Sequence, residues 1–274
     1  MQDKIGIMGN GFVGNALYKG ITTFHKNVFV YDVDIKRSIN TLQDIIKCNI
    51  IFLCIPTPKD PVTGEVDMSY TYQAIESLID GGVKDDVILV IKSTVRPGTC
   101  KKLQEKYNIP VLSNPEFLTE RRAYEDFMNP RLILIGGDIK PRNRLQKIYE
   151  IGFPSNCNHG KEYKYFLTDS ITSELIKYTT NCFFSVKIAF ANEVKQICDE
   201  SGGNWEELIE GFVKEGRVFA DHLDVPGHDG KVGFGGRCFP KDLSAMVEYA
   251  KQNNIDPKIM QAAIDKNKEI RNDT

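Results

Sequence analysis

The sequence predicts an α/β protein with a doubly wound, mainly parallel sheet, followed by a long central helix and a smaller all-α domain. In the first half, apolar runs of strand length alternate with stretches long enough for helices, which is typical of a parallel sheet covered on both faces. In the second half, no proline interrupts the chain between Thr168 and Gly202, as expected for one long helix. The length of 274 residues fits two modest domains, which we place at residues 1–168 and 169–274.

Each expected strand is a short, nearly continuous apolar run. These runs are Lys4–Gly9, Asn27–Asp32, Asn49–Ile55, Asp86–Lys92, Pro110–Leu112 and Arg131–Gly137. Ser69–Ile79 is typical of the helices between them. The long helix is expected over Asp169–Glu200, and its apolar residues on several faces predict burial between the sheet domain and a partner subunit. Further helices are expected at Asn204–Phe212 and Pro240–Gln252.

Composition and charge exclude several classes of protein. The formal net charge of −2 provides no basic field for nucleic acid or an anionic membrane. Apolar runs such as Val87–Ile91 are too short to cross a bilayer, and the first residues lack the pattern of a signal peptide. The 7 cysteines are odd in number and form no CxxC, which predicts free thiols in the cytoplasm and no zinc or other metal site.

A glycine motif follows the first apolar run and precedes a helix start. Its residues are Gly9, Asn10, Gly11, Phe12, Val13 and Gly14. This spacing permits a tight turn, close approach of the backbone to a pyrophosphate, and helix packing. Asp32 ends the second run, where a carboxylate meets ribose hydroxyls and favours NAD over NADP, although Lys36 and Arg37 weaken that preference. We predict a Rossmann-like NAD site, with a glycine turn that binds no ligand as the alternative.

Cys238 lies between a glycine-rich loop and an expected helix start at Pro240. A helix N-terminus favours the thiolate, which is the nucleophilic form of cysteine. The alternative is a small buried apolar residue, the usual role of a free cysteine. In an NAD protein, a thiol nucleophile suggests an aldehyde that is captured as a thiohemiacetal, oxidised to a thioester and then hydrolysed.

Six blocks occur in the order of a known family. They are GNGFVG, CIPTP, KSTVRPG, NPEFLTE, ELIKYTTN and GFGGRCFPKD. In these blocks the chain resembles the UDP-glucose/GDP-mannose dehydrogenases, most closely the UDP-glucose branch. The resemblance implies NAD-dependent four-electron oxidation of the sugar C6 alcohol, from UDP-glucose to UDP-glucuronate, through a cysteine-bound intermediate. It also implies a role in polysaccharide biosynthesis and a homodimer formed through the central helix.

The resemblance assigns catalytic roles by matching positions. Cys238 is similar to the nucleophile, and Glu116 to the carboxylate that activates water for thioester hydrolysis. Asp242 is similar to an aspartate that helps to hold this water, and Thr94 to a threonine that positions it.

Lys177 and Asn181 lie four residues apart on the expected long helix, among apolar neighbours. An ammonium and an amide there can stabilise an alkoxide or thiohemiacetal oxyanion, and the resemblance implies this role. The alternative is a lysine whose ammonium reaches solvent.

NPEFLTE is expected to begin a helix. Asn114 and Pro115 fit its N-cap and first position, so that Glu116 and Glu120 share one face. The resemblance places Glu120 near the nicotinamide. A solvated acidic helix start, with Glu120 paired to a neighbouring arginine, is the alternative.

The remaining expected site residues bind cofactor or substrate. Beside the glycine motif, the cofactor residues are Asp32, Arg37, Thr57, Pro58, Ser93, Thr94 and Glu120. The substrate residues are Glu116, Phe117, Leu118, Lys177, Asn181, Arg217, Val232, Gly233, Phe234, Gly235 and Gly236. Arg217 is expected to reach the substrate of a neighbouring subunit, or else to be a solvated arginine.

Family members usually continue into a further α/β domain that holds much of the nucleotide. The sequence ends at Thr274, which leaves open a naturally short form or a truncated one. In either case His222–Lys231 is expected to cover part of the nucleotide instead. Three alternatives remain open. A single-step hydroxyacid dehydrogenase would not need Cys238, a GDP-mannose or UDP-N-acetylmannosamine dehydrogenase would keep it, and a non-catalytic nucleotide-binding subunit would use neither a nucleophile nor a water base.

Overall fold

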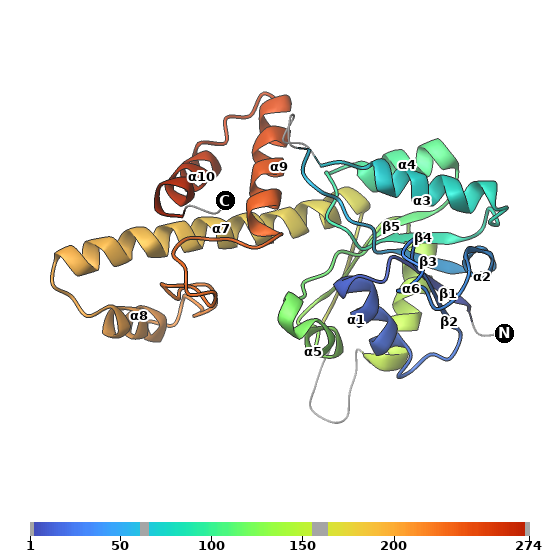
Figure 1. Cartoon of the computed structure of the whole chain (residues 1–274), viewed down its shortest axis with the longest axis horizontal. Helices are drawn as coiled ribbons and strands as arrows, with labels where there is room; N and C mark the ends of the chain where they lie inside the picture. Colours follow the sequence, from blue (N-terminus) through green and yellow to red (C-terminus); the bar gives the residue numbers. More distant parts are fainter. Residues whose placement is uncertain (1–2, 61–65, 155–163, 272–274) are drawn as a thin grey trace. The chain divides into compact units, whose positions relative to one another are not determined.

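The computed structural model describes residues 3–60, 66–154 and 164–271 (Figure 1). The described chain forms two compact units. Unit 1 contains the residues up to Pro58 together with Val66–Lys177, and unit 2 contains the residues from Tyr178 onward together with Lys59 and Asp60. This division falls inside the long helix, whereas the expected domain boundary at 168/169 lies at its start and stays a prediction. Cys157 lies outside the described residues.

Unit 1 is built on a seven-stranded sheet in the order β2-β1-β3-β4-β5-β6-β7. The strands are β1 (Ile5–Met8), β2 (Val28–Tyr31), β3 (Ile50–Leu53), β4 (Ile88–Ile91), β5 (Val111–Ser113), β6 (Ile133–Gly136) and β7 (Tyr165–Thr168). The first five pair in parallel, β6 pairs antiparallel with β5, and β7 pairs in parallel with β6. The predicted doubly wound, mainly parallel sheet is confirmed. The prediction missed β7, an edge strand that has no fully buried residue.

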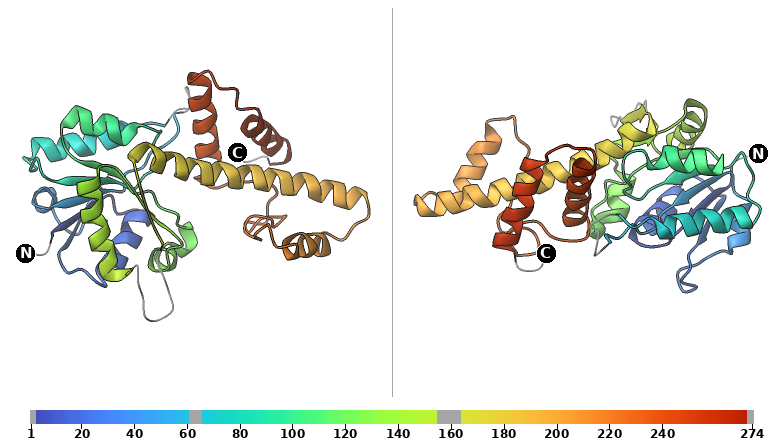
Figure 2. Two further views of the ribbon diagram at one scale, coloured as in Figure 1. Left: turned by 180° about the vertical axis from the view of Figure 1, so that it is seen from behind. Right: turned by 90° about the horizontal axis from the view of Figure 1, so that it is seen from above.

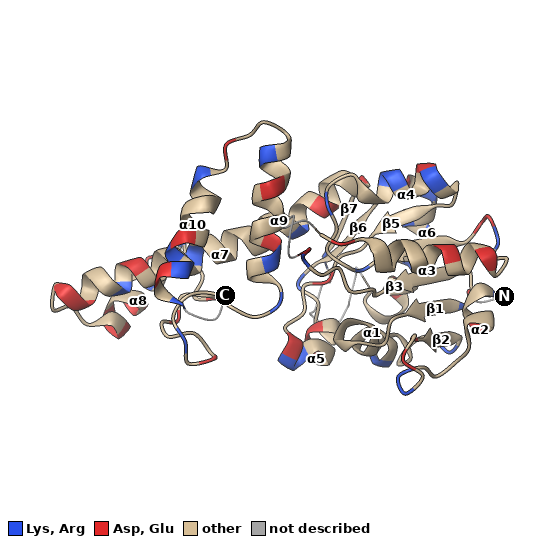
Figure 3. Cartoon of the chain, turned by 45° about the horizontal axis from the view of Figure 1, so that its top comes forward, with Lys and Arg blue, Asp and Glu red and all other residues tan. Residues whose placement is uncertain are grey.

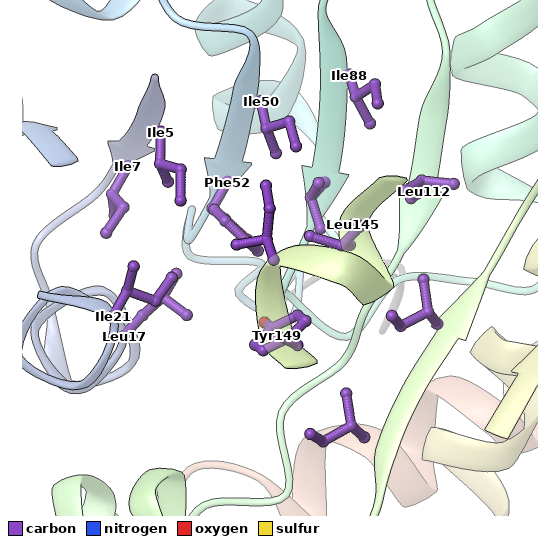
Figure 4. Close-up of a cluster of buried hydrophobic side chains, with 14 of the residues drawn as sticks. Ile5, Ile7, Leu17, Ile21, Ile50, Phe52, Ile88, Leu112, Leu145 and Tyr149 are labelled. Carbon is purple, nitrogen blue, oxygen red and sulfur yellow. The ribbon is translucent and has the colours of Figure 1, made fainter. Parts of the chain in front are cut away.

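Helices cover both faces of this sheet (Figure 2). In unit 1 they are α1 (Phe12–Ile21), α2 (Leu42–Ile46), α3 (Ser69–Asp80), α4 (Thr99–Tyr107), the 3-10 helix η1 (Glu120–Arg122), α5 (Ala123–Met128) and α6 (Ile139–Gly152). One core includes Leu17 of α1 and Leu145 of α6 against strand residues such as Ile5 (Figure 4). The core on the other face includes Ile75 of α3 and Leu103 of α4. Because both faces are buried, the strands read as continuous apolar runs.

The long helix α7 runs over Ser170–Glu200, as predicted to within one residue. After it, unit 2 is helical, with α8 (Trp205–Lys214), α9 (Phe239–Gln252) and α10 (Lys258–Ile270). Gly202 has a φ of +72°, a left-handed conformation that glycine adopts readily where a helix ends. The Asn204 side chain then accepts a hydrogen bond from Glu207 N and caps α8.

Lys and Arg are interspersed with Asp and Glu along the helices of both units (Figure 3). Among the described residues, no helix combines the length and apolar character that crossing a membrane requires. In the same part of the chain, the cysteines are free and no cluster of His, Cys, Asp or Glu has the makings of a metal site.

Candidate active site

The glycine turn joins β1 to α1, as its sequence predicts. Gly11 is the N-cap of α1 and makes no side-chain cap hydrogen bond, while Phe12 and Val13 form the first turn. A Cβ atom at Gly14 would lie 1.8 Å from the Gly9 carbonyl oxygen, whereas one at Gly11 would meet nothing within 4 Å. The turn therefore needs glycine at position 14 for packing, and it leaves open space at Gly11 beside the helix N-terminus. This arrangement fits a dinucleotide pyrophosphate.

Asp32 follows β2 and is tied to the glycine turn. Its carboxylate accepts hydrogen bonds from Asn10 N at 2.6 Å and from Asp34 N at 2.9 Å. The Asn10 side chain donates to the Arg37 carbonyl oxygen at 2.7 Å, and the exposed Arg37 guanidinium lies 3.4 Å from Asp34. The structure thus brings together Asn10, Asp32 and Arg37. Since β2 and β3 flank β1 on opposite sides, these residues lie at the switch point where nucleotides bind in open α/β sheets.

The loops after β3 and β4 are bonded to each other at the same edge of the sheet. Thr57 Oγ1 donates to the Thr94 carbonyl oxygen at 3.1 Å, and Ser93 Oγ donates to the Ile55 carbonyl oxygen. Pro58 follows and is exposed. The predicted cofactor residues of these two loops are therefore neighbours in unit 1.

The predicted helix at Asn114 is wrong. The first helical residues after β5 are Glu120–Arg122 of η1, so Glu116 and Glu120 do not share a helix face. An N-cap side chain accepts a hydrogen bond from its own helix, but Asn114 is buried and its amide nitrogen donates to the Leu134 carbonyl oxygen at 2.7 Å. Glu116 lies in a turn, where its carboxylate accepts from Leu118 N at 2.5 Å. Glu120 is exposed.

Glu116 forms a buried ion pair with Lys177 of α7. Lys177 Nζ lies 3.4 Å from Glu116 Oε1, and the two side chains are only 6% and 10% exposed. The ammonium also lies 5.1 Å from the centroid of the Phe117 ring. Lys177 therefore does not extend into solvent, and the alternative based on solvation is wrong. A buried ammonium can stabilise an oxyanion, and a carboxylate beside it can accept a proton from water.

Cys238 lies just before a helix, as predicted, and is partly exposed. It is the N-cap residue of α9, which begins at Phe239, one residue earlier than expected. One turn later, Asp242 is fully buried and its backbone N–H donates to the Cys238 carbonyl oxygen at 2.8 Å. The Asp242 carboxylate accepts hydrogen bonds from Asn181 Nδ2 at 2.5 Å and Lys241 Nζ at 2.6 Å. By contrast, burial raises the pKa of the nearby Cys182 thiol to about 12, which keeps that thiol protonated. The roles of Asn181 and Asp242 in catalysis stay predictions.

Two family models match the chain. The UDP-glucose/GDP-mannose dehydrogenase family, NAD binding domain, matches residues 37–152. The central domain of the same family matches residues 171–269. The chain belongs to the UDP-glucose/GDP-mannose dehydrogenase family. It therefore contains an NAD-binding domain, and its glycine turn and Asp32 fit that cofactor.

Several curated relatives are named UDP-glucose 6-dehydrogenase. The protein of Rickettsia bellii is 40% identical over 233 residues, which cover 83% of this chain and 51% of the relative. That of Rickettsia felis is 38% identical over 236 residues, which cover 84% of this chain and 49% of the relative. The chain spans about half the length of the curated relatives it matches.

Solved structures of low identity share the fold. A UDP-glucose dehydrogenase from Pyrobaculum islandicum has a TM-score of 0.82 and 24% identity, covering 98% of this chain and 68% of that chain. The 3-hydroxyisobutyrate dehydrogenase of Mycobacterium tuberculosis has a TM-score of 0.77 and 14% identity, covering 100% and 95%. Dehydrogenases named for different substrates thus share this architecture. The fold alone therefore does not identify the reaction, which must be argued from the side chains of the site.

The central-domain region of this family member holds its glycine-rich loop with buried polar side chains that the sequence analysis missed. Asn192 Oδ1 accepts from Gly233 N at 3.1 Å, while the Asn267 amide accepts from Phe234 N at 2.7 Å and donates to Phe234 O at 2.9 Å. Arg271 donates to the backbone of the same loop. Polar residues on otherwise apolar helix faces are the signal that could have identified them. The same glycine-rich loop contains the other predicted substrate residues, Val232, Gly235 and Gly236.

Two further predicted residues stand apart from these groups. Arg217 is exposed in unit 2, and its guanidinium pairs with Glu215 at 2.6 Å. Glu120 is exposed at the start of η1 in unit 1, whereas Glu116 lies before this helix and forms the buried ion pair with Lys177. The structure therefore presents two groups of candidate catalytic residues. Glu116 and Lys177 form one in unit 1, and Asn181, Cys238 and Asp242 form the other in unit 2.

Proposed function

We propose that the chain catalyses the NAD-dependent, four-electron oxidation of the C6 alcohol of UDP-glucose to the carboxylate of UDP-glucuronate. Family membership and the relatives named UDP-glucose 6-dehydrogenase support this reaction. The observation that carries the proposal is Cys238 at the start of α9 with fully buried Asp242 one turn later. A single-step alcohol dehydrogenase has no use for a thiol at this position, whereas an oxidation through a thioester requires one.

The thiol converts one difficult oxidation into a sequence of simpler steps. The alcohol is first oxidised to an aldehyde, and Cys238 Sγ adds to its carbon to give a thiohemiacetal. A second oxidation converts this adduct to a thioester. Water then attacks the thioester carbon, the C–S bond breaks, and the carboxylate and free thiol are released. NAD, when bound, accepts a hydride in each of the two oxidations.

Lys177 and Glu116 supply the charges that these steps need. Each oxidation and addition passes through negative charge on the sugar oxygen, which the Lys177 ammonium stabilises together with Asn181. Glu116 accepts a proton from the attacking water during hydrolysis, while Thr94 and Asp242 help to position that water. The 3.4 Å contact between Lys177 and Glu116 supports a shared site for the two side chains.

We also propose a cytoplasmic homodimer formed through α7. Three large apolar side chains of this helix are spaced seven residues apart and remain exposed, namely Phe183 (61%), Phe190 (55%) and Ile197 (62%). Such a spacing places them on one face of the helix. An apolar stripe of this kind supports helix-to-helix association, and Arg217 then contacts the substrate of the partner subunit.

The experiment is NADH release with UDP-glucose, GDP-mannose and UDP-N-acetylmannosamine, with the product identified in each case. We expect two NADH for each UDP-glucose consumed, because a carboxylate forms from an alcohol by loss of four electrons. One NADH with an aldehyde product would contradict the thioester route. NAD binding without any NADH formation would indicate a non-catalytic nucleotide-binding subunit.

A further inference from the structure

Lys92 is a buried cation that the proposed mechanism does not use. It follows β4 directly, and only 6% of the residue is exposed. Desolvation lowers the pKa of its ammonium to about 8. Since burial of a charge is unfavourable unless specific partners offset it, the surroundings of Lys92 indicate what the charge does.

The hydrogen bonds of Lys92 lead to the turn that holds Glu116. Lys92 Nζ donates to Asn114 Oδ1 at 3.0 Å, and the Tyr149 hydroxyl donates to the same oxygen at 2.7 Å. Asn114 is fixed further by its backbone N–H, which donates to the Ile91 carbonyl oxygen at 2.9 Å. Because Tyr149 already provides a donor to Asn114 Oδ1, the packing of Asn114 does not by itself require an ammonium.

The titratable groups around Lys92 and Asn114 come from four parts of the chain. Glu116 favours its charged form, and Lys177 of α7 disfavours it. Cys54, at the end of β3, also faces it, but burial raises the pKa of that thiol to about 12. The Tyr149 hydroxyl of α6 has a pKa well above its usual value for the same reason. Glu116 is therefore the carboxylate whose charge favours the ammonium of Lys92, while its direct ion pair is with Lys177.

We infer that Lys92 is a positioning residue for hydrolysis, which orients Glu116 through Asn114 and a second buried positive charge. This inference rests on the proposed function. The Lys92 ammonium should then affect thioester hydrolysis and not thioester formation, because only hydrolysis uses Glu116 as a base. If Lys92 only supported the fold, its replacement would lower the amount of folded protein. The rates of thioester formation and thioester hydrolysis would then fall by the same factor.

The test replaces Lys92 by methionine, which matches its length without the charge. Lys102→Met is the matched control, since this lysine is exposed on α4, the helix that follows the same strand. With UDP-glucose and NAD, we expect Lys92→Met to form the thioester within about two-fold of the wild-type rate. Hydrolysis should fall roughly 10- to 100-fold, the scale of effect that misplacing a catalytic group produces. Intact-protein mass should show the sugar adduct on Cys238, and the melting temperature should be unchanged or higher.

Each other outcome has a defined meaning. Wild-type hydrolysis in Lys92→Met would overturn the inference, and so would a lower melting temperature with both steps reduced in parallel. If the wild-type chain releases no NADH with any sugar nucleotide, the proposed function itself fails. If the wild type is active and Lys92→Met hydrolyses the thioester at the normal rate, the proposed function stands and only the role of Lys92 is refuted.

Discussion

Glu174 is a buried carboxylate that joins α7 to another helix within unit 1. It accepts hydrogen bonds from Gly98 N at 2.5 Å and Cys100 N at 2.8 Å. Gly98 is the N-cap of α4 and has no side chain that could satisfy these donors, so Glu174 satisfies them from a distant part of the sequence. Burial raises the pKa of Glu174 to about 7, although the backbone N–H groups act in the opposite direction.

This pKa predicts a pH dependence of stability. The carboxyl group binds a proton more readily in the folded chain than its ordinary pKa of 4.5 would allow. Its contribution to the free energy of unfolding is therefore fully present below about pH 4.5 and is lost as the pH rises through about 7. Relative to Glu174→Gln, the wild type should gain up to about 3 kcal/mol between pH 8 and pH 5 in urea unfolding.

Glu105→Gln is the control, because Glu105 is exposed on α4. Its free energy of unfolding should differ from that of the wild type by a nearly constant amount over the same pH range. Parallel curves for wild type and Glu174→Gln would show that Glu174 does not titrate as described.

At the scale of elements, local sequence patterns predicted the regular parts of the fold. The glycine turn and α7 were predicted because the strand, the glycines and the helix ends all lie within short stretches. The helix at Asn114 was predicted wrongly because its side chain bonds to Leu134 on β6. Helix propensity depends only on the local sequence and therefore cannot predict this contact with a distant strand. The tertiary contact overrides the local preference for a helix.

The apolar stripe of α7 gives a prediction about assembly. Phe190→Glu places a charge at the centre of the stripe formed by Phe183, Phe190 and Ile197. In analytical ultracentrifugation, we expect a dimer for the wild type and a monomer for this variant, because a desolvated charge opposes association.

Ile259→Glu is the control for this assembly prediction. Ile259 is 74% exposed on α10, so a charge there should leave the dimer unchanged. A monomeric wild type, or a Phe190→Glu variant that stays dimeric, would remove the stripe as an interface.

At the scale of the whole molecule, the proposed reaction uses residues that lie far apart in the sequence. Motifs identified Glu116, Lys177 and Cys238 from the sequence, since each lies in a recognisable block. The supporting residues were not predictable in this way, because their partners are distant in sequence. Lys92 contacts a residue 22 positions away, and Asn267 contacts one 33 positions away.

The central claim is that Cys238 forms the thioester and that Glu116 is the base for its hydrolysis. The most direct test is the intact mass of Glu116→Gln after incubation with NAD and UDP-glucose, beside a Glu116→Gln variant that also carries Cys238→Ser. The amide cannot act as a base for water, so thioester formation should continue while its hydrolysis stalls. We predict a burst of NADH and one added sugar-nucleotide mass, localised to Cys238 and absent from the double variant. Unmodified Glu116→Gln protein that turns over at the wild-type rate would contradict the account.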